Sequence, residues 1–176
     1  YPLETGSRFT GVGHVVMQTG GLDGAGCSAE EVQVQMERMK SRVHASCLWD
    51  TLEFMKAGGR CSAVAALGAN LLKLKPCIEV DNRNGGRMHT GKKYRGAMER
   101  CLVQYVHDKL DGQADLDLDR IFITHSGSPT RDIQAVKEAL RGIAAFREIY
   151  VTRASCTISA HCGPRTLGIL FMTKEG

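Results

Sequence analysis

Three short segments of the chain combine a tight turn with a cationic or imidazole side chain, a combination that suits an anion. The segments are Gly58-Gly59-Arg60, Leu74-Lys75-Pro76 and Ser159-Ala160-His161-Cys162-Gly163-Pro164. Glycine lets a ligand approach the backbone closely, and a neighbouring arginine or histidine supplies charge-assisted hydrogen bonds. A bland interpretation stays open for each segment: a helix stop with a solvated arginine, a surface lysine on an edge strand, and a histidine hydrogen-bonded within a turn.

Nucleophilic catalysis is the second chemistry that these side chains allow. His161 and Cys162 are a poor pair, because neighbours on a strand face opposite sides of a sheet. A Cys–His pair from distant segments, and hence a hydrolase or a transferase, stays open without a supporting motif. Its candidate members are Cys61 and Cys156 together with His125 and His161.

The remaining polar residues give no pattern typical of a metal or cofactor site. The six histidines show no helical pairing with a carboxylate or a second ligand. Gly11 and Gly13 lack the third glycine and the later acidic residue of a dinucleotide fingerprint. We therefore expect neither a metal nor a cofactor.

Composition restricts the class of protein further. A chain of 176 residues with 43% hydrophobic and 24% charged residues is typical of one soluble globular domain, alone or with a fragment of a second. The net charge of +4 is small and dispersed, which argues against a nucleic-acid partner, and no apolar run reaches the ~18 residues of a membrane span. Seven cysteines without a CxxC pair indicate reduced thiols in the cytoplasm.

The hydrophobic periodicity predicts the elements that must position these segments. Ser28 and Glu31 form a capping box before a helix of about four turns, and further helices are expected over residues 63–72, 94–110 and from Ser128 onwards. Strands are expected at residues 43–49, 74–81, 87–92, 120–125, 148–153, 157–161 and 166–173. Hairpins alternate with strand-helix-strand crossovers, so we expect an α/β fold: a two-layer mixed sheet of about six of these strands with helices packed on one face.

Taken in order, five segments resemble the DegV family of bacterial lipid-binding proteins along nearly the whole chain. They are residues 6–13 (GSRFTGVG), 26–32 (GCSAEEV), 50–60 (DTLEFMKAGGR), 71–78 (LLKLKPCI) and 159–168 (SAHCGPRTLG). Each segment alone is moderately specific, and the shared order makes the resemblance strong.

The resemblance implies a binding protein rather than an enzyme. Family members are two-domain proteins, so this chain is expected to be the carboxyl-terminal part. Residues 1–45 would be remnant helices of a truncated first domain, and residues 46–176 the domain that holds a lipid tail. A long-chain fatty acid would lie with its tail in an apolar tunnel, which the helices at 63–72 and 94–110 could line. Its carboxylate would lie at the domain interface, where Arg60 and His161 face the head group. In some members a fatty acid kinase phosphorylates the carried lipid, so a kinase subunit is the second expected partner.

Two positions depart from the family pattern. Arg165 stands where members usually place glycine, which adds bulk and charge beside His161, and Met88-His89-Thr90 replaces a Val-Arg-Thr segment. Half of the head-group site is expected to lie outside this chain. We therefore predict reduced or no lipid binding by this chain alone, without submicromolar affinity for palmitate.

Overall fold

A computed structural model of the chain describes residues 11–54 and 74–174. These residues form a six-stranded sheet with the strand order β3-β2-β1-β6-β4-β5. The strands are β1 (Val43–Leu48), β2 (Leu74–Asp81), β3 (Arg87–Arg95), β4 (Arg120–His125), β5 (Glu148–Arg153) and β6 (Leu167–Met172). β4 and β5 pair parallel, whereas the other neighbours pair antiparallel. The mixed six-stranded sheet expected from the sequence is confirmed.

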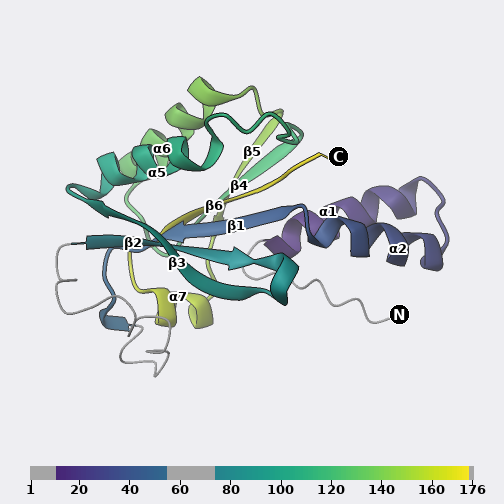
Figure 1. Cartoon of the computed structure of the whole chain (residues 1–176), viewed down its shortest axis with the longest axis horizontal. Helices are drawn as coiled ribbons and strands as arrows, with labels where there is room; N and C mark the ends of the chain where they lie inside the picture. Colours follow the sequence, from purple (N-terminus) through teal and green to yellow (C-terminus); the bar gives the residue numbers. More distant parts are fainter. Residues whose placement is uncertain (1–10, 55–73, 175–176) are drawn as a thin grey trace.

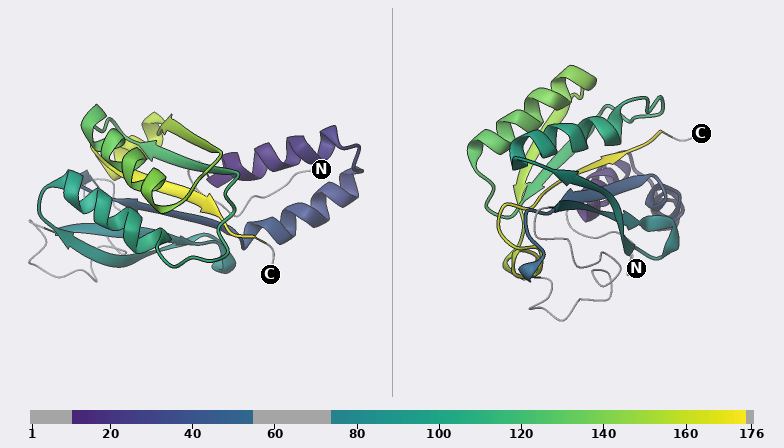
Figure 2. Two further views of the ribbon diagram at one scale, coloured as in Figure 1. Left: turned by 90° about the horizontal axis from the view of Figure 1, so that it is seen from above. Right: turned by 60° about the vertical axis from the view of Figure 1, so that its left-hand side comes forward.

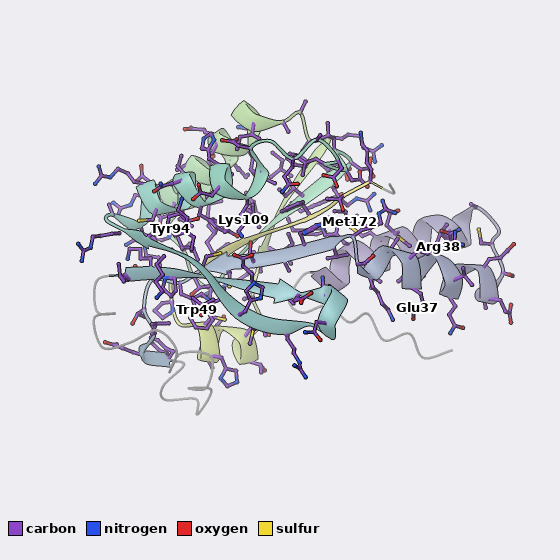
Figure 3. The ribbon with its side chains drawn as sticks, in the orientation of Figure 1. Glu37, Arg38, Trp49, Tyr94, Lys109 and Met172 are labelled. Atoms are coloured by element: carbon purple, nitrogen blue, oxygen red, sulfur yellow. The ribbon has the colours of Figure 1, made fainter. Side chains whose placement is uncertain are left out.

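Two amphipathic helices, α5 (Met98–Leu110) and α6 (Thr130–Ile143), pack together on one face of the sheet (Figure 1). Their apolar stripes meet alternate strand residues, and this layer is the main core. Its fully buried members include Leu102, Tyr105, Val136, Leu140, Ile121, Ile123 and Ile169. In Figure 3, Tyr94 and Lys109 lie on this side of the sheet and Trp49 lies on the other. The strand residues that face α5 and α6 alternate along each strand, and in the middle of the sheet they are fully buried.

The short helix α7 (Cys156–Cys162) lies against the opposite face of the sheet (Figure 1). Ile158 and Cys162 pack there with Cys47, Trp49 and Ile78. The sequence predicted a strand at residues 157–161, and that prediction is wrong. The reason is the Ser155 cap, whose side chain accepts a hydrogen bond from the backbone N–H of Ile158 and so favours a helical turn. α7 is therefore the exception to an arrangement with α5 and α6 on one face.

At the far end of the sheet, α1 (Gly11–Gly24) and α2 (Ala29–Lys40) form a helical pair that projects beyond the strands (Figure 2). α2 begins at the predicted capping box: the Ser28 side chain accepts from the Glu31 backbone, and the Glu31 carboxylate accepts from Ser28 N at 2.8 Å. The pair is joined to the sheet through His14, whose ring bonds the Leu170 carbonyl at 2.9 Å. The division of the chain at residues 45 and 46 stays a prediction.

β2 lies inside the sheet, between β3 and β1. Pro76 was expected to mark either an edge strand or the start of a strand, and its place as the third residue of β2 agrees with the second. The sheet accommodates the missing proline N–H near the start of β2, where the register with β3 shifts between Pro76 and Ile78. The turn from β2 to β3 follows the predicted hairpin: a 3-10 turn, η2 (Asn82–Asn84), leads into Gly85 and Gly86, which both have positive φ.

Candidate functional site

A narrow apolar slot lies between α7 and the sheet face turned away from α5 and α6. Its cavity volume is about 20 Å³. One wall follows Thr166, Gly168 and Leu170, three alternate positions on one face that span roughly 13 Å at the usual strand rise. Ala45 and Cys47 contribute the matching alternate positions of β1. The slot thus covers neighbouring positions of β1 and β6 and reaches the end of β4 at Thr124 and His125.

α7 forms the other wall of the slot with Ile158 and Cys162, which lie four residues apart and so share one face of the helix. Burial raises the pKa of the Cys162 thiol to about 11. It also raises the pKa of the Cys47 thiol, and the nearby Cys162 raises that pKa further. Both thiols therefore stay protonated at neutral pH, and this part of the slot is uncharged.

His161 lies on α7 and is half-buried, beside the slot-lining Cys162. Its Nδ1 atom is buried and has no hydrogen-bond partner among the residues that the structure describes. A buried polar atom without a partner is costly and uncommon in a folded protein. The residue is not among those that line the slot itself. Arg60, the other expected head-group residue, lies outside the described residues, as does the predicted helix over 63–72.

The turn from α7 to β6 is held by hydrogen bonds to the end of β4. Ser126 accepts from the Arg165 N–H at 2.8 Å through its carbonyl, and its hydroxyl donates to the Gly163 carbonyl. Gly163 has a φ of 77°, and a Cβ there would lie 2.6 Å from the Phe54 ring. The turn is thus fixed by backbone contacts that require glycine at this position.

Arg165 does not extend toward His161 as an extra cation, which corrects the expectation from the sequence. Its Nε donates to Asp132 Oδ2 at 2.8 Å and its Nη2 to Oδ1 at 3.2 Å. Asp132 is fully buried in the first turn of α6. The guanidinium therefore neutralises a buried carboxylate and ties the turn to α6.

Lys75 is not a surface lysine either. Its ammonium group is paired with Asp50, and its side chain is only 16% exposed. Leu48 at the end of β1 pairs with both Cys77 and Leu167, so Lys75 lies at the same end of the sheet as the turn before β6. In the segment Leu74-Lys75-Pro76, the positive charge of Lys75 is thus neutralised by Asp50.

The Cys–His alternative finds no assembled pair among the described residues. His125 uses its Nδ1 as an acceptor for the Ser128 N–H at 3.1 Å, and its pKa is lowered by burial and by Arg153. No hydrogen bond joins a cysteine to a histidine in the described part of the chain. Within the same residues no group of three His, Cys, Asp or Glu side chains could hold a metal, and none of the helices is both long and apolar enough to span a membrane.

The helix of residues 94–110 was expected to line the lipid tail; it does not line the slot beside α7, and its role at the tail stays a prediction. Met98, Leu102 and Tyr105 are instead enclosed in the filled core with α6. The residues that line the slot were missed because they come from separate strands and α7. One signal was available: Gly168 interrupts an otherwise apolar strand, which is typical of a close approach between backbones.

Comparison with known proteins gives a consistent family. The model described as "Uncharacterised protein, DegV family" matches residues 1–174. A DegV domain-containing protein of Streptomyces coelicolor is 26% identical over 175 residues, which cover 98% of this chain and 59% of the relative. Among solved structures, "Fatty Acid Binding of a DegV family Protein from Thermus thermophilus" superposes with a TM-score of 0.79 at 25% identity, over 97% of this chain and 60% of that one.

The chain is also similar to a solved structure whose name refers to a fatty acid kinase. It is the Streptococcus pneumoniae Fatty Acid Kinase (Fak) B3 protein loaded with linoleic acid, with a TM-score of 0.75 at 18% identity, over 93% of this chain and 56% of that one. At that identity the likeness shows the fold. The chain spans about three fifths of the length of the relatives that it matches.

Proposed function

The chain belongs to the DegV family, and from that premise we propose that it binds a long-chain fatty acid whose tail occupies the slot beside α7. The observation that carries the proposal is the slot itself, a narrow apolar space over β1 and β6 with neutral thiols in its walls. The Thermus thermophilus relative, which is described by its fatty acid binding, has the same fold around this region.

The energetics favour an acyl chain over a polar ligand in such a slot. Each methylene withdrawn from water contributes about 0.8 kcal/mol, so a chain that fills a slot of roughly 13 Å contributes several kcal/mol against the cost of association. Walls of Ile158, Leu170 and Ala45 provide dispersion contacts and no competing charge.

The carboxylate needs a polar partner, because a buried and unpaired charge is strongly unfavourable. We propose that it lies beside His161, with Arg60 as a second head-group residue. The buried Nδ1 of His161, which has no partner within the described part of the chain, supports this placement, since a ligand oxygen would supply the missing hydrogen bond.

The proposal extends to a partner and to the organisation of the whole protein. The carried lipid would be presented to a fatty acid kinase, as the Fak B3 likeness suggests, so that the nucleotide chemistry resides on another subunit. Residues 1–45 would belong to a first domain and residues 46–176 to the tail-binding domain. We expect the protein in the cytoplasm and expect no catalysis by this chain.

Palmitate titration of the chain, followed by methyl NMR, tests the proposal. The methyl signals of Ile158 and Leu170 should shift, with half-saturation above the submicromolar range because the head-group site is incomplete. Ala154→Trp, which fills the slot from its wall, should abolish these shifts. Ala160→Trp is the matched control, because Ala160 is exposed on α7 and does not line the slot.

Two results would count against fatty acid binding. Because the slot lies within this chain, the proposal requires reduced rather than absent binding, so the first such result is an absence of methyl shifts up to the solubility limit of palmitate. The second is identical titrations for the two tryptophan variants. Hydrolase or transferase turnover that is lost on substitution of a cysteine or of His161 would favour the enzyme alternative instead.

A further inference from the structure

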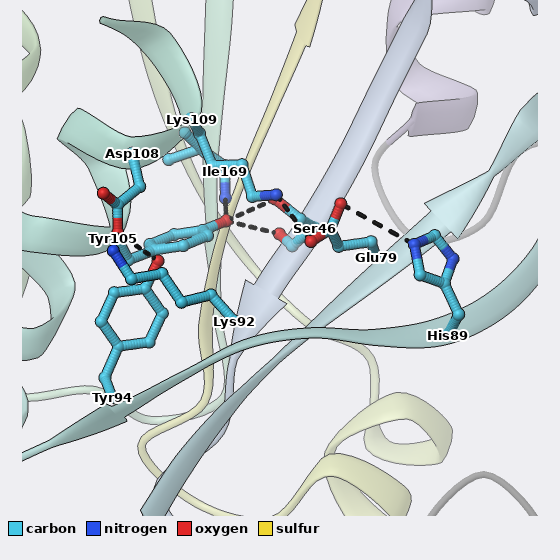
Figure 4. A network of polar contacts seen from close by, with 9 residues as sticks. All are labelled: Ser46, Glu79, His89, Lys92, Tyr94, Tyr105, Asp108, Lys109 and Ile169. Carbon is cyan, nitrogen blue, oxygen red and sulfur yellow. Dashed lines mark hydrogen bonds and ion pairs between the residues drawn. The ribbon is translucent and has the colours of Figure 1, made fainter.

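A single tyrosine hydroxyl sits within the ladder between β1 and β6 (Figure 4). Tyr105 is fully buried on α5, and its hydroxyl reaches the backbone of both strands. It donates to the Ser46 carbonyl at 2.9 Å and accepts from the Ile169 N–H at 3.1 Å. Ser46 and Ile169 are register partners in the antiparallel pair. In an antiparallel pair, the N–H and C=O groups of directly opposed residues can bond each other. Here the hydroxyl lies between them and bridges the two groups.

The hydrogen bonds of this hydroxyl are saturated. A phenol has one proton to donate and two lone pairs to accept with. The Ser46 Oγ lies 2.8 Å from the Tyr105 oxygen and supplies the second accepted bond. Burial raises the pKa of Tyr105, so the proton needed for the Ser46 carbonyl is present. All three sites of the hydroxyl are thus used to hold the two strands.

The slot passes over this point on the opposite face of the sheet. Gly168, next to Ile169, lines the slot, and so do Ser46 and Cys47. A Cβ at Gly168 would collide with the Ser46 carbonyl oxygen and with Cys47 Cβ. The Ser46 carbonyl and Cys47 therefore already occupy the space that a side chain at residue 168 would need, so a shift of the Ser46 carbonyl, which Tyr105 binds, changes the width of the slot at Gly168.

We infer that Tyr105 is a positioning residue for the acyl chain: its hydroxyl, inserted from the core side between β1 and β6, holds the slot open at Gly168. This inference rests on the proposed function and deepens it. A long chain has to cross this point to occupy the slot from Thr166 to Leu170. A shorter acyl chain occupies only part of the slot, so its binding depends less on the width of the slot at Gly168.

Tyr105→Phe tests the inference, because it removes one oxygen and keeps the ring in the core. The Ile169 N–H and the Ser46 carbonyl should then pair directly, and a scalar coupling across that hydrogen bond should appear in the NMR spectrum. Palmitate affinity should fall at least tenfold, whereas octanoate affinity should change less than twofold. Tyr94→Phe is the matched control: Tyr94 is also buried, and its hydroxyl donates to Asp108 at 2.8 Å without touching the ladder.

The outcomes separate the two proposals. If wild-type protein binds palmitate and Tyr105→Phe keeps the same palmitate-to-octanoate ratio, the role of Tyr105 is refuted while fatty acid binding stands. If the wild type binds neither acid, the proposed function fails and the inference fails with it. If Tyr105→Phe does not fold, the inference can still be tested on the wild-type protein. Palmitate should shift the Ile169 amide signal, and octanoate should not. An Ile169 amide signal that palmitate leaves unshifted would overturn the inference.

Discussion

Replacement of Arg165 by alanine should be among the most destabilising changes at the turn before β6. Asp132 is fully buried, and Arg165 supplies it with two hydrogen bonds of 2.8 and 3.2 Å. Removing one partner of a buried ion pair costs about 3–5 kcal/mol. Two features of the site reduce that figure. The Arg165 side chain is 29% exposed, and the first turn of α6 favours a negative charge by about 0.3–1 kcal/mol. We therefore expect a loss of about 2–3 kcal/mol in the free energy of unfolding.

Urea denaturation of three variants makes this prediction specific. Arg131 contacts the same carboxylate from 3.8 Å with a side chain that is 69% exposed, so Arg131→Ala should cost less than about 0.5 kcal/mol. Arg165→Gly should be milder than Arg165→Ala by about 0.5–1 kcal/mol, because the φ of 62° at this position strains every residue except glycine. An equal loss for Arg131→Ala and Arg165→Ala would refute the assignment of the buried pair.

Two further predictions concern the helical pair. Burial lowers the pKa of His14 below its usual value, so the unfolded chain takes up a proton first. Stability should then fall as the pH drops below about 6.5, by at most ~1.4 kcal/mol per pH unit for this group. Urea melts at pH 7.5 and 5.5 should show this loss, and His14→Gln, which keeps a donor for the Leu170 carbonyl, should reduce it; an unchanged pH dependence would exclude His14 as the cause. Ser28→Ala should cost about 1 kcal/mol through the lost cap of α2, and an unchanged thermal midpoint would argue against the capping box.

Local signals in the sequence predicted much of the fold. The capping box of Ser28 and Glu31 set the start of α2, and the apolar stripe of residues 94–110 predicted α5. Such signals depend on hydrogen bonds and periodicities within a few residues, so they can be seen in the chain before it is folded.

Residues 157–161 show where local signals mislead. Threonine and isoleucine in this segment favour a strand, yet the segment is the helix α7. The spacing of Ile158 and Cys162, four residues apart and both against the slot, was the helical signal. In a helix of only seven residues, packing against the sheet outweighs propensity.

The candidate site could be predicted only in part, because its parts meet through long-range pairing. Cys47 and Gly168 face each other only through the register of β1 with β6. The Arg165 guanidinium binds Asp132 rather than pointing at His161, because a buried carboxylate on another element attracts it. Neither contact leaves a trace in the spacing of residues along the chain.

The position of β6 has a consequence for the order of assembly during synthesis. β6 is the last strand along the described chain, yet it lies in the middle of the sheet, between β1 and β4. The hairpin half (β3-β2-β1) and the crossover half (β4-β5) emerge from the ribosome first, each with one edge still unpaired. The two halves can join only through β6. The nascent protein therefore exposes two unpaired, aggregation-prone strand edges, those of β1 and β4, until translation of β6 is complete. Pairing so distant in sequence also makes folding slow, which leaves time for a chaperone to cover those edges.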